Sequence, residues 1–254
     1  MAVDEAILEA IGKGKALPTL RLYAWDPPCL SLGFAQPVMD VDPEGLARNG
    51  WQIVRRPTGG RAILHADELT YSVIAPLDEP RVKGKVLESY RRLSQALVAA
   101  LRRLGLPAQA DKEYSLPLET QAGGAVCFEV PSNYEITVAG KKLIGSAQAR
   151  RMEGVLQHGS LPLCGDLTRI TRALAYPDGA AREQAARRLL DHAATAESLG
   201  KMITWQAAAA AFTAAFEETL QIQFQAAELS HEEMDRAAEL VKTKYGHPDW
   251  TNRI

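Results

Sequence analysis

The chain has 254 residues but only three cysteines, and it has no uninterrupted apolar run of the roughly 18 residues that a membrane-spanning helix needs. The cysteines, Cys29, Cys127 and Cys164, are odd in number, far apart and outside any C-x-x-C pair, which argues against a disulfide framework and against a zinc site. The N-terminus is acidic from its fourth residue and lacks the basic region of a signal peptide. We therefore expect a cytoplasmic protein that needs no membrane, metal or cofactor.

A large excess of charge is also missing. The chain has 29 basic and 31 acidic residues, a formal net charge of -2, and no long run of one sign. Because nucleic acids are bound through many cations, we expect no nucleic-acid ligand. With 46% hydrophobic residues the chain can bury a sizeable core, as one domain or as a body with a small appendage. We predict a single domain over residues 1–254.

The first half of the sequence alternates apolar and polar residues between turn signals, as strands do. We predict two hairpins, the first around Pro27-Pro28 and the second around the Pro-Thr-Gly-Gly turn at 57–60. A later pair of strands is expected to turn at Ala139-Gly140. The expected strands are 19–25, 29–34, 52–56, 61–65, 69–75, 133–151 and 155–163.

Helical patterns dominate the remainder. Residues 85–104 repeat apolar side chains at the spacing of one helical stripe and end before Gly105. The segments 182–202 and 204–222 are rich in alanine, and Ser230 with Glu233 has the form of a capping box. The predicted fold is α+β: a mixed, largely antiparallel central sheet flanked by helices, with a helix-rich part over residues 165–254.

The stretch "RRPTGGRAILH", residues 55–65, is the first that points to a binding site. Gly59 and Gly60 let the backbone approach a ligand closely, and strand alternation places Arg61, Ile63 and His65 on one face. The alternative is an ordinary Pro-Gly hairpin with a surface arginine and a hydrogen-bonded histidine. The motif alone does not decide between them.

Two further stretches combine polar side chains with glycine. In "GKKLIGSAQ", residues 140–148, Lys142 precedes a patch of small residues where a backbone can lie against a substrate. In "QHGS", residues 157–160, His158 lies beside a glycine. The alternatives are a solvated lysine pair and a histidine with a structural hydrogen bond.

Cys127 lies between Gly123-Gly124 and Pro131. A free thiol with a pKa of about 8.5 is only a few per cent ionised at neutral pH, and a neighbouring ammonium increases that fraction. Lys142 follows one hairpin later, so the two side chains can meet across a sheet. The alternative is a small buried hydrophobe, a reading that suits Cys29 and Cys164 better because both belong to apolar strand patterns.

Taken together, "VRRPTGGRAILHADELTYSV", "VCFEVPSNYEITVAGKKLIGSAQARR" and "VLQHGSLPL" resemble the biotin/lipoate protein ligase superfamily, and within it the octanoyl-[acyl carrier protein]:protein N-octanoyltransferases of the LipM type. The resemblance runs almost end to end and implies the catalytic-domain fold of that superfamily. It implies a ping-pong reaction without ATP, with octanoyl-acyl carrier protein as donor. The implied acceptor is the lysine of a lipoyl-type domain such as the glycine cleavage H protein, and the enzyme is expected to be a monomer.

The same resemblance implies roles for single residues. Cys127 would be the acyl-thioester nucleophile, and Lys142 would lower its pKa and orient the acyl carbonyl. Backbone amides near Gly145 would stabilise the oxyanion. The octanoyl chain would contact Arg56, Thr58, Gly59, Gly60, His65, Gly145, Ser146, Ala147, Gln157, His158 and Gly159.

One departure and several alternatives accompany this interpretation. Relatives carry a strand before the first helix, so either the start is truncated or the sheet lacks an edge. The alternative functions are an ATP-dependent lipoate-protein ligase, an octanoyl amidotransferase between lipoyl domains, a non-catalytic acyl-binding module, and a cysteine hydrolase that pairs Cys127 with His65 or His158. For docking of acidic carrier domains, Arg55, Arg150 and Arg151 are the candidates.

Overall fold

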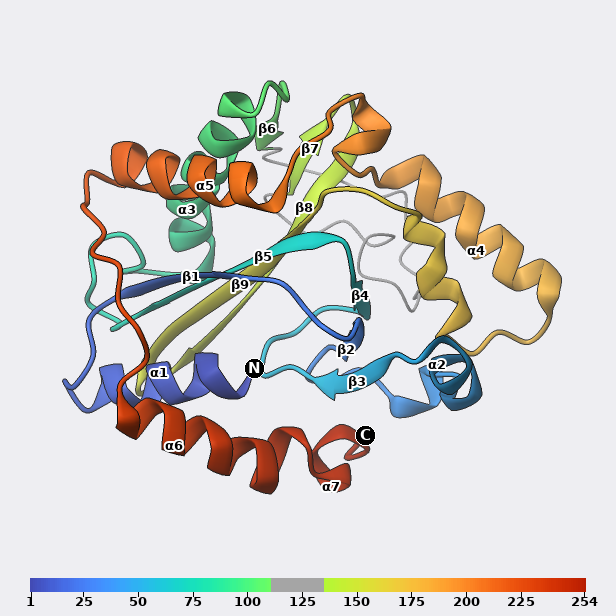
Figure 1. The fold of residues 1–254 in the computed structure, drawn as a ribbon, viewed down its shortest axis with the longest axis horizontal. Coiled ribbons are helices and arrows are strands. Elements are labelled where there is room, and N and C mark those ends of the chain that lie inside the picture. Colours follow the sequence, from blue (N-terminus) through green and yellow to red (C-terminus); the bar gives the residue numbers. More distant parts are fainter. Residues whose placement is uncertain (111–134) are drawn as a thin grey trace.

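Two sheets organise the fold (Figure 1). The computed structural model describes residues 1–110 and 135–254. Six strands form the large sheet, and all neighbours within it are antiparallel. In spatial order they are β1 (Thr19–Tyr23), β5 (Glu68–Ala75), β9 (Gly154–Pro162), β8 (Lys141–Arg151), β7 (Ile136–Val138) and β6 (Gln109–Ala110).

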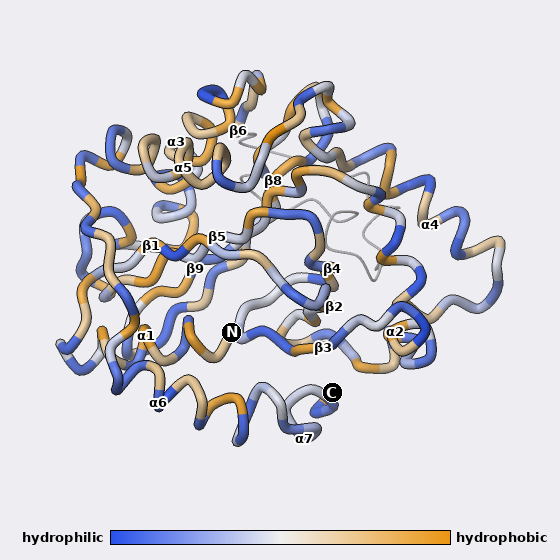
Figure 2. The backbone as a smooth tube through the Cα atoms, viewed as in Figure 1, coloured by the Kyte–Doolittle hydropathy of each residue, from blue (hydrophilic) through white to orange (hydrophobic). Residues whose placement is uncertain are grey.

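The small sheet is mixed. Its central strand β2 (Cys29–Leu32) runs parallel to β3 (Gln52–Arg55) and antiparallel to β4 (Ile63–His65). The helices α2 (Pro43–Asn49) and α4 (Gly179–His192) lie on this side of the molecule (Figure 1). In Figure 2, α4 carries many hydrophilic residues, as expected of a helix at the outside of the fold.

Helices cover both faces of the large sheet. On one face lie α3 (Val86–Arg103) and α5 (Trp205–Leu220), which pack Leu97 and Phe212 with Tyr71 of β5 into the main hydrophobic core. On the other face lies α1 (Ala2–Gly12), backed by α6 (His231–Leu240), the π-helical turn η6 (Val241–Tyr245) and α7 (Pro248–Thr251). None of the helices in the described ranges is both long and apolar enough to cross a membrane.

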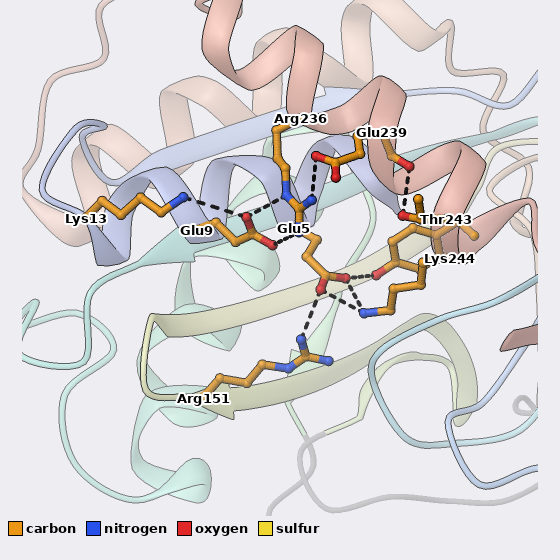
Figure 3. A network of polar contacts seen from close by, with 9 residues as sticks. Glu5, Glu9, Lys13, Arg151, Arg236, Glu239, Thr243 and Lys244 are labelled. Carbon is orange, nitrogen blue, oxygen red and sulfur yellow. Dashed lines mark hydrogen bonds and ion pairs between the residues drawn. The ribbon is translucent and has the colours of Figure 1, made fainter.

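Polar contacts fasten the C-terminal helices to α1 (Figure 3). The Glu5 carboxylate accepts hydrogen bonds from Arg151, Lys244 and Tyr245. The Glu9 carboxylate accepts two bonds of 2.8 Å from Arg236. We call this set, Glu5, Glu9, Arg151, Arg236, Lys244 and Tyr245, the α1–α6 network. It joins residues more than two hundred positions apart in the sequence.

Most predicted elements are confirmed. The helices expected at 85–104 and 204–222 are α3 and α5, and the strands around Ala139-Gly140 form the expected β7–β8 hairpin. Ser230 and Glu233 make both bonds of the capping box. The predicted α+β class, with a largely antiparallel sheet and a helix-rich C-terminal part, is confirmed as well.

The helix predicted over 182–202 is wrong in its second half. The helix α4 ends at His192, and the chain then runs extended beside β8, where the Ala194 amide donates to the Lys142 carbonyl at 3.0 Å. Pairing with a strand edge outweighs the helix propensity of alanine here, since propensity differences amount to only about 0.5–1 kcal/mol per residue.

Both hairpins predicted in the first half are wrong. The strand β1 pairs with β5 of the large sheet, whereas β2 belongs to the small sheet. The strand β2 also separates β3 from β4, so the strands flanking the Pro-Thr-Gly-Gly turn do not pair with each other. Short local spacing suggested hairpins, but β2 has two long-range partners, β3 and β4.

Candidate active site

A cleft of about 780 Å³ lies between the 56–61 loop, strands β8 and β9, and the N-terminal end of α3. It brings together most of the residues that the sequence predicted for the site. The predicted residues among its lining are Arg56, Gly59, Gly60, His65, Lys142, Gly145, Ser146, Ala147, His158 and Gly159. Cys127 lies outside the described residues, so its role stays a prediction.

Arg56 shapes the 56–61 loop from inside. Its buried guanidinium donates to the carbonyl oxygens of Gly59 at 2.8 Å, Arg61 at 2.7 Å and Ser31 at 3.0 Å. The loop also lies close against Gly33, the residue after β2, because a Cβ atom added to Gly33 would lie 1.8 Å from the Gly60 carbonyl oxygen. The loop therefore has one tightly determined conformation, with glycine backbone at the cleft surface.

His65 has a fixed orientation. Its Nδ1 lies 2.7 Å from a Glu68 carboxylate oxygen, its Nε2 lies 2.7 Å from the Ser31 hydroxyl, and its ring stacks on Trp25 with centroids 4.4 Å apart. Both ring nitrogens are thus engaged, which disfavours His65 as the base of a cysteine hydrolase. Sequence reasoning missed Glu68, although it follows His65 by three residues.

His158 is held in its neutral form. Burial lowers the pKa of His158 to about 3, with the Arg56 charge acting in the same direction and Asp4 opposing it. Its Nε2 lies 2.6 Å from the hydroxyl of Thr58, a predicted site residue that is buried and does not itself line the cleft. Its Nδ1 has no hydrogen-bond partner among the described residues.

A second orphan polar atom lies beside it. The Ser160 hydroxyl lines the cleft, is buried, and likewise has no partner within residues 1–110 and 135–254. In the sheet, Ser160 is flanked by Gly145 of β8 on one side and Thr70 of β5 on the other. Because buried polar groups are normally paired, these two atoms mark where a polar group of a ligand would be placed.

Lys142 extends from β8 into the cleft wall and is buried, with only 4% of its side chain exposed. Its ammonium lies 2.5 Å from a carboxylate oxygen of Glu135, which is equally buried. Sequence reasoning did not propose Glu135, although it stands in the quoted "NYEITV" stretch.

Gln157 is another predicted site residue that does not line the cleft. It is buried, and its amide group hydrogen-bonds the Tyr71 hydroxyl at 3.1 Å and the Gln148 side chain at 2.9 Å. The neighbouring Ser146 hydroxyl bonds Tyr71 at 2.7 Å. These contacts stabilise the sheet at this point.

Neither described cysteine suits nucleophilic chemistry. Burial raises the pKa of the Cys29 thiol to about 12. Burial, with Asp67 and Glu197 adding to it, also raises the pKa of Cys164. Both residues lie outside the cleft lining, as the small-hydrophobe interpretation expects.

Arg55 was predicted to dock carrier domains, and this prediction is wrong. Its side chain is fully buried and donates to the carbonyl oxygens of Gly33, Gln36 and Thr251 at 2.5–2.8 Å. Of the other two candidates, Arg151 pairs with Glu5, and Arg150 donates to the Val82 carbonyl at 2.9 Å.

A family model matches most of the chain. Residues 1–217 match the model of the lipoyl protein ligase A/B catalytic domain. The chain belongs to this family. Residues of the small sheet, the 56–61 loop and Lys142 of β8 are among those that line the cleft.

Within the family, the chain is similar to proteins named Octanoyltransferase LipM. It is 42% identical over 258 residues to that of Kyrpidia tusciae and 40% identical over 257 residues to that of Symbiobacterium thermophilum, covering all of this chain and 93% of each relative. The expected resemblance to octanoyltransferases of the LipM type, and with it the acyltransferase class, is confirmed.

Solved structures give the same fold. The bi-partite lipoate protein ligase from Thermoplasma acidophilum superposes with a TM-score of 0.79 over 98% of this chain and 91% of that chain. At 23% sequence identity this likeness concerns the fold alone.

Proposed function

We propose that this protein transfers an octanoyl group from octanoyl-acyl carrier protein to the lysine of a lipoyl-type domain, in lipoate biosynthesis, through a thioester on Cys127. The carrying observation is that a chain about 40% identical to octanoyltransferases gathers the family's loop, lysine and small residues around one cleft. As acceptor we propose a domain such as the glycine cleavage H protein. As setting we propose the cytoplasm, with the enzyme a monomer.

In the first half-reaction, the Cys127 thiolate attacks the carbonyl carbon of the donor thioester. A new carbon–sulfur bond forms, the bond to the carrier's sulfur breaks, and the carrier leaves as a thiol with the proton that the Cys127 thiol had lost. Exchange of one thioester for another is nearly thermoneutral, so no ATP is needed. The buried Lys142 ammonium, held by Glu135 at 2.5 Å, supplies the positive charge that favours a thiolate.

In the second half-reaction, the neutral amine of the acceptor lysine attacks the same carbonyl carbon. The carbon–nitrogen bond forms, the Cys127 sulfur is expelled, and the proton lost by the amine restores the thiol. Formation of the amide makes this step downhill. His158 Nδ1 and the Ser160 hydroxyl, which have no partner among the described residues, and the backbone at Gly145 are the groups available to the carbonyl oxygen.

Intact-protein mass spectrometry tests the proposal. The protein is incubated with octanoyl-acyl carrier protein, and we expect a gain of one octanoyl group that hydroxylamine removes. Cys127→Ala should abolish the adduct. Cys164→Ala is the matched control and should retain it, because its thiol lies outside the cleft lining and has a raised pKa. An adduct that persists in Cys127→Ala would overturn the thioester assignment.

The alternatives need different donors. Modification of an acceptor domain with ATP and free octanoate or lipoate, in the absence of acyl carrier protein, would identify an ATP-dependent ligase. Transfer only from an octanoylated lipoyl domain would identify an amidotransferase. We expect neither substrate set to match octanoyl-acyl carrier protein in rate.

A further inference from the structure

Two segments that line the cleft combine exposed apolar side chains with nearby cations. On one rim, Val86 and Leu87 at the start of α3 are 42% and 48% exposed, and both line the cleft. On the other rim, Phe34 is 39% exposed and also lines it. Large apolar side chains that stay exposed around a cleft are typical of an interaction surface.

The α3 rim is strongly basic. Residues 81–92 carry five cations, at 81, 83, 85, 91 and 92, and a single anion, Glu88. That anion is engaged locally, because a Glu88 carboxylate oxygen accepts the Lys85 backbone amide at 2.8 Å. Lys83 and Lys85 are exposed, and neither forms an ion pair with a carboxylate of the described residues. Their charges are therefore available to a partner.

The rim at Phe34 repeats this combination. The Arg253 guanidinium lies 3.7 Å from the Phe34 ring centroid and donates to the Phe34 carbonyl oxygen at 3.0 Å. Arg61 belongs to the cleft lining. We call Arg61, Lys83, Lys85 and Arg253 the cationic rim. The chain as a whole has a net charge of -2, so these cations do not reflect an overall excess of positive charge.

We propose that the cationic rim is the docking surface for the acidic carrier protein that delivers the acyl group on a phosphate-bearing arm. The inference rests on the proposed function. It assigns the surface to the donor because that arm carries an anion past the rim, whereas the acceptor's lysine, which reacts as a neutral amine, is not attracted by cations there. Complementary charge of this kind acts mainly on the rate of association.

Depth supports the same assignment. The Lys142 side chain is only 4% exposed, so the reactive thioester must travel inward past the rim to reach it. A flexible arm can do this while its protein stays outside, resting on Val86, Leu87 and Phe34. Apolar contact then adds affinity to the steering by charge.

The test compares three donors on one double variant, Lys83→Glu/Lys85→Glu. Acylation rates are measured against donor concentration by intact-protein mass spectrometry, with octanoyl-acyl carrier protein, octanoyl-phosphopantetheine and neutral octanoyl-pantetheine. We expect kcat/KM to fall by about tenfold or more with the carrier protein, by less with the phosphorylated arm, and to stay within about twofold with the neutral thioester. Added salt should reduce the wild-type rate with the carrier protein in the same way.

Lys201→Glu is the matched charge control. Lys201 is exposed and its ammonium lies beside Gly105, just past the C-terminal end of α3. The 18 residues of α3 separate it from the rim by roughly 27 Å at 1.5 Å per residue. This variant should acylate at the wild-type rate with every donor.

Each outcome decides something. An unchanged rate with the carrier protein would overturn the docking surface, and so would an equal loss with all three donors, which would indicate damage to the site. A defect confined to transfer from the acyl-enzyme to the acceptor domain would assign the rim to the acceptor and overturn the donor proposal. If wild-type protein forms no adduct with any donor, the proposed function itself fails.

Discussion

The α1–α6 network and the floor of the cleft are both buried and polar, but they differ in how completely they are paired. Glu5 in the network is surrounded by Arg151, Lys244 and Tyr245. On the cleft floor, His158 Nδ1 and the Ser160 hydroxyl have no partner among the described residues. A saturated network stabilises the fold, whereas orphan polar atoms cost stability and are kept where a ligand can pair with them.

The largest expected effect comes from Lys142→Met. Octanoyl transfer should fall by about 100-fold or more, because in the proposed mechanism Lys142 acts on the reacting atoms. Stability should fall too, by about 3 kcal/mol, because the buried ion pair between Lys142 and Glu135 is broken. Acylation kinetics and urea unfolding measure the two losses.

The adjacent lysine provides the control for that variant. Lys141 donates to the Leu190 carbonyl from a more exposed position and does not line the cleft, so Lys141→Met should retain activity. The double variant Glu135→Gln/Lys142→Met should regain stability without regaining activity. Full activity in Lys142→Met would remove this lysine from the mechanism.

The next effect should be purely structural. Glu5→Gln removes the charge on which the α1–α6 network converges, and we expect a loss of roughly 2 kcal/mol in the free energy of unfolding. Activity per folded molecule should be unchanged, since Glu5 is not part of the cleft lining. Glu239 also pairs with Arg236 (Figure 3) but its side chain is 59% exposed, so Glu239→Gln should cost less than about 0.5 kcal/mol. Equal losses in the two variants would contradict the comparison.

The ionisation of Glu5 should also make the stability of the fold depend on pH. Burial alone would oppose ionisation, but hydrogen bonds from Lys244 and Tyr245 outweigh it and lower the pKa of Glu5 below its usual value. A carboxyl with a lowered pKa adds stability that is present at neutral pH and lost as the pH falls through its folded-state pKa. The acid sensitivity of unfolding should therefore weaken in Glu5→Gln.

His158 should also lower stability in acid, because the folded protein holds it in its neutral form. Its pKa is about 3 in the folded protein and about 6.5 when unfolded, so between these values the unfolded chain binds a proton that the folded chain does not. Lowering the pH from 7 to 5 should thus cost about 2 kcal/mol through this group. Urea unfolding at both pH values should show a loss smaller by that amount in His158→Gln, and an unchanged loss would refute the assignment.

Two serines in neighbouring strands give the smallest and most direct contrast. Ser72 donates to the buried Asp4 carboxylate at 2.9 Å, so Ser72→Ala should cost about 1–2 kcal/mol. Ser160→Ala removes a hydroxyl that has no partner in the described structure, and the free energy of unfolding should change by less than about 0.5 kcal/mol. Thermal and urea unfolding of both variants decide the point. A large loss in Ser160→Ala would mean that the hydroxyl is already paired.

An element could be predicted from the sequence when the residues that determine it lie close together along the chain, and not when they are far apart. The start of α6 was predictable because Ser230 and Glu233 satisfy each other within one turn. The place of β2 was not, because its partners β3 and β4 become neighbours only through the fold. The end of α4 at His192 was missed because it depends on pairing with β8.

The site divides in a similar way. Motif residues such as Lys142, Gly145 and His158 were named in advance through the resemblance, and they line one cleft. Glu68 and Glu135 were missed because an acidic residue in a strand-like stretch usually faces solvent, and their burial depends on pairing with His65 and Lys142. Arg55 was misjudged for the same reason, since its partners are backbone carbonyls that the sequence does not mark.

The contacts of Arg55 have a consequence for synthesis on the ribosome. Its guanidinium binds the Thr251 carbonyl, and the Ile254 carbonyl accepts the Val38 amide at 2.8 Å. Arg55 and Val38 thus gain these contacts only when residues 251–254 have left the ribosome. Since domains fold as units during translation, the part of the cleft wall that these contacts support should form late.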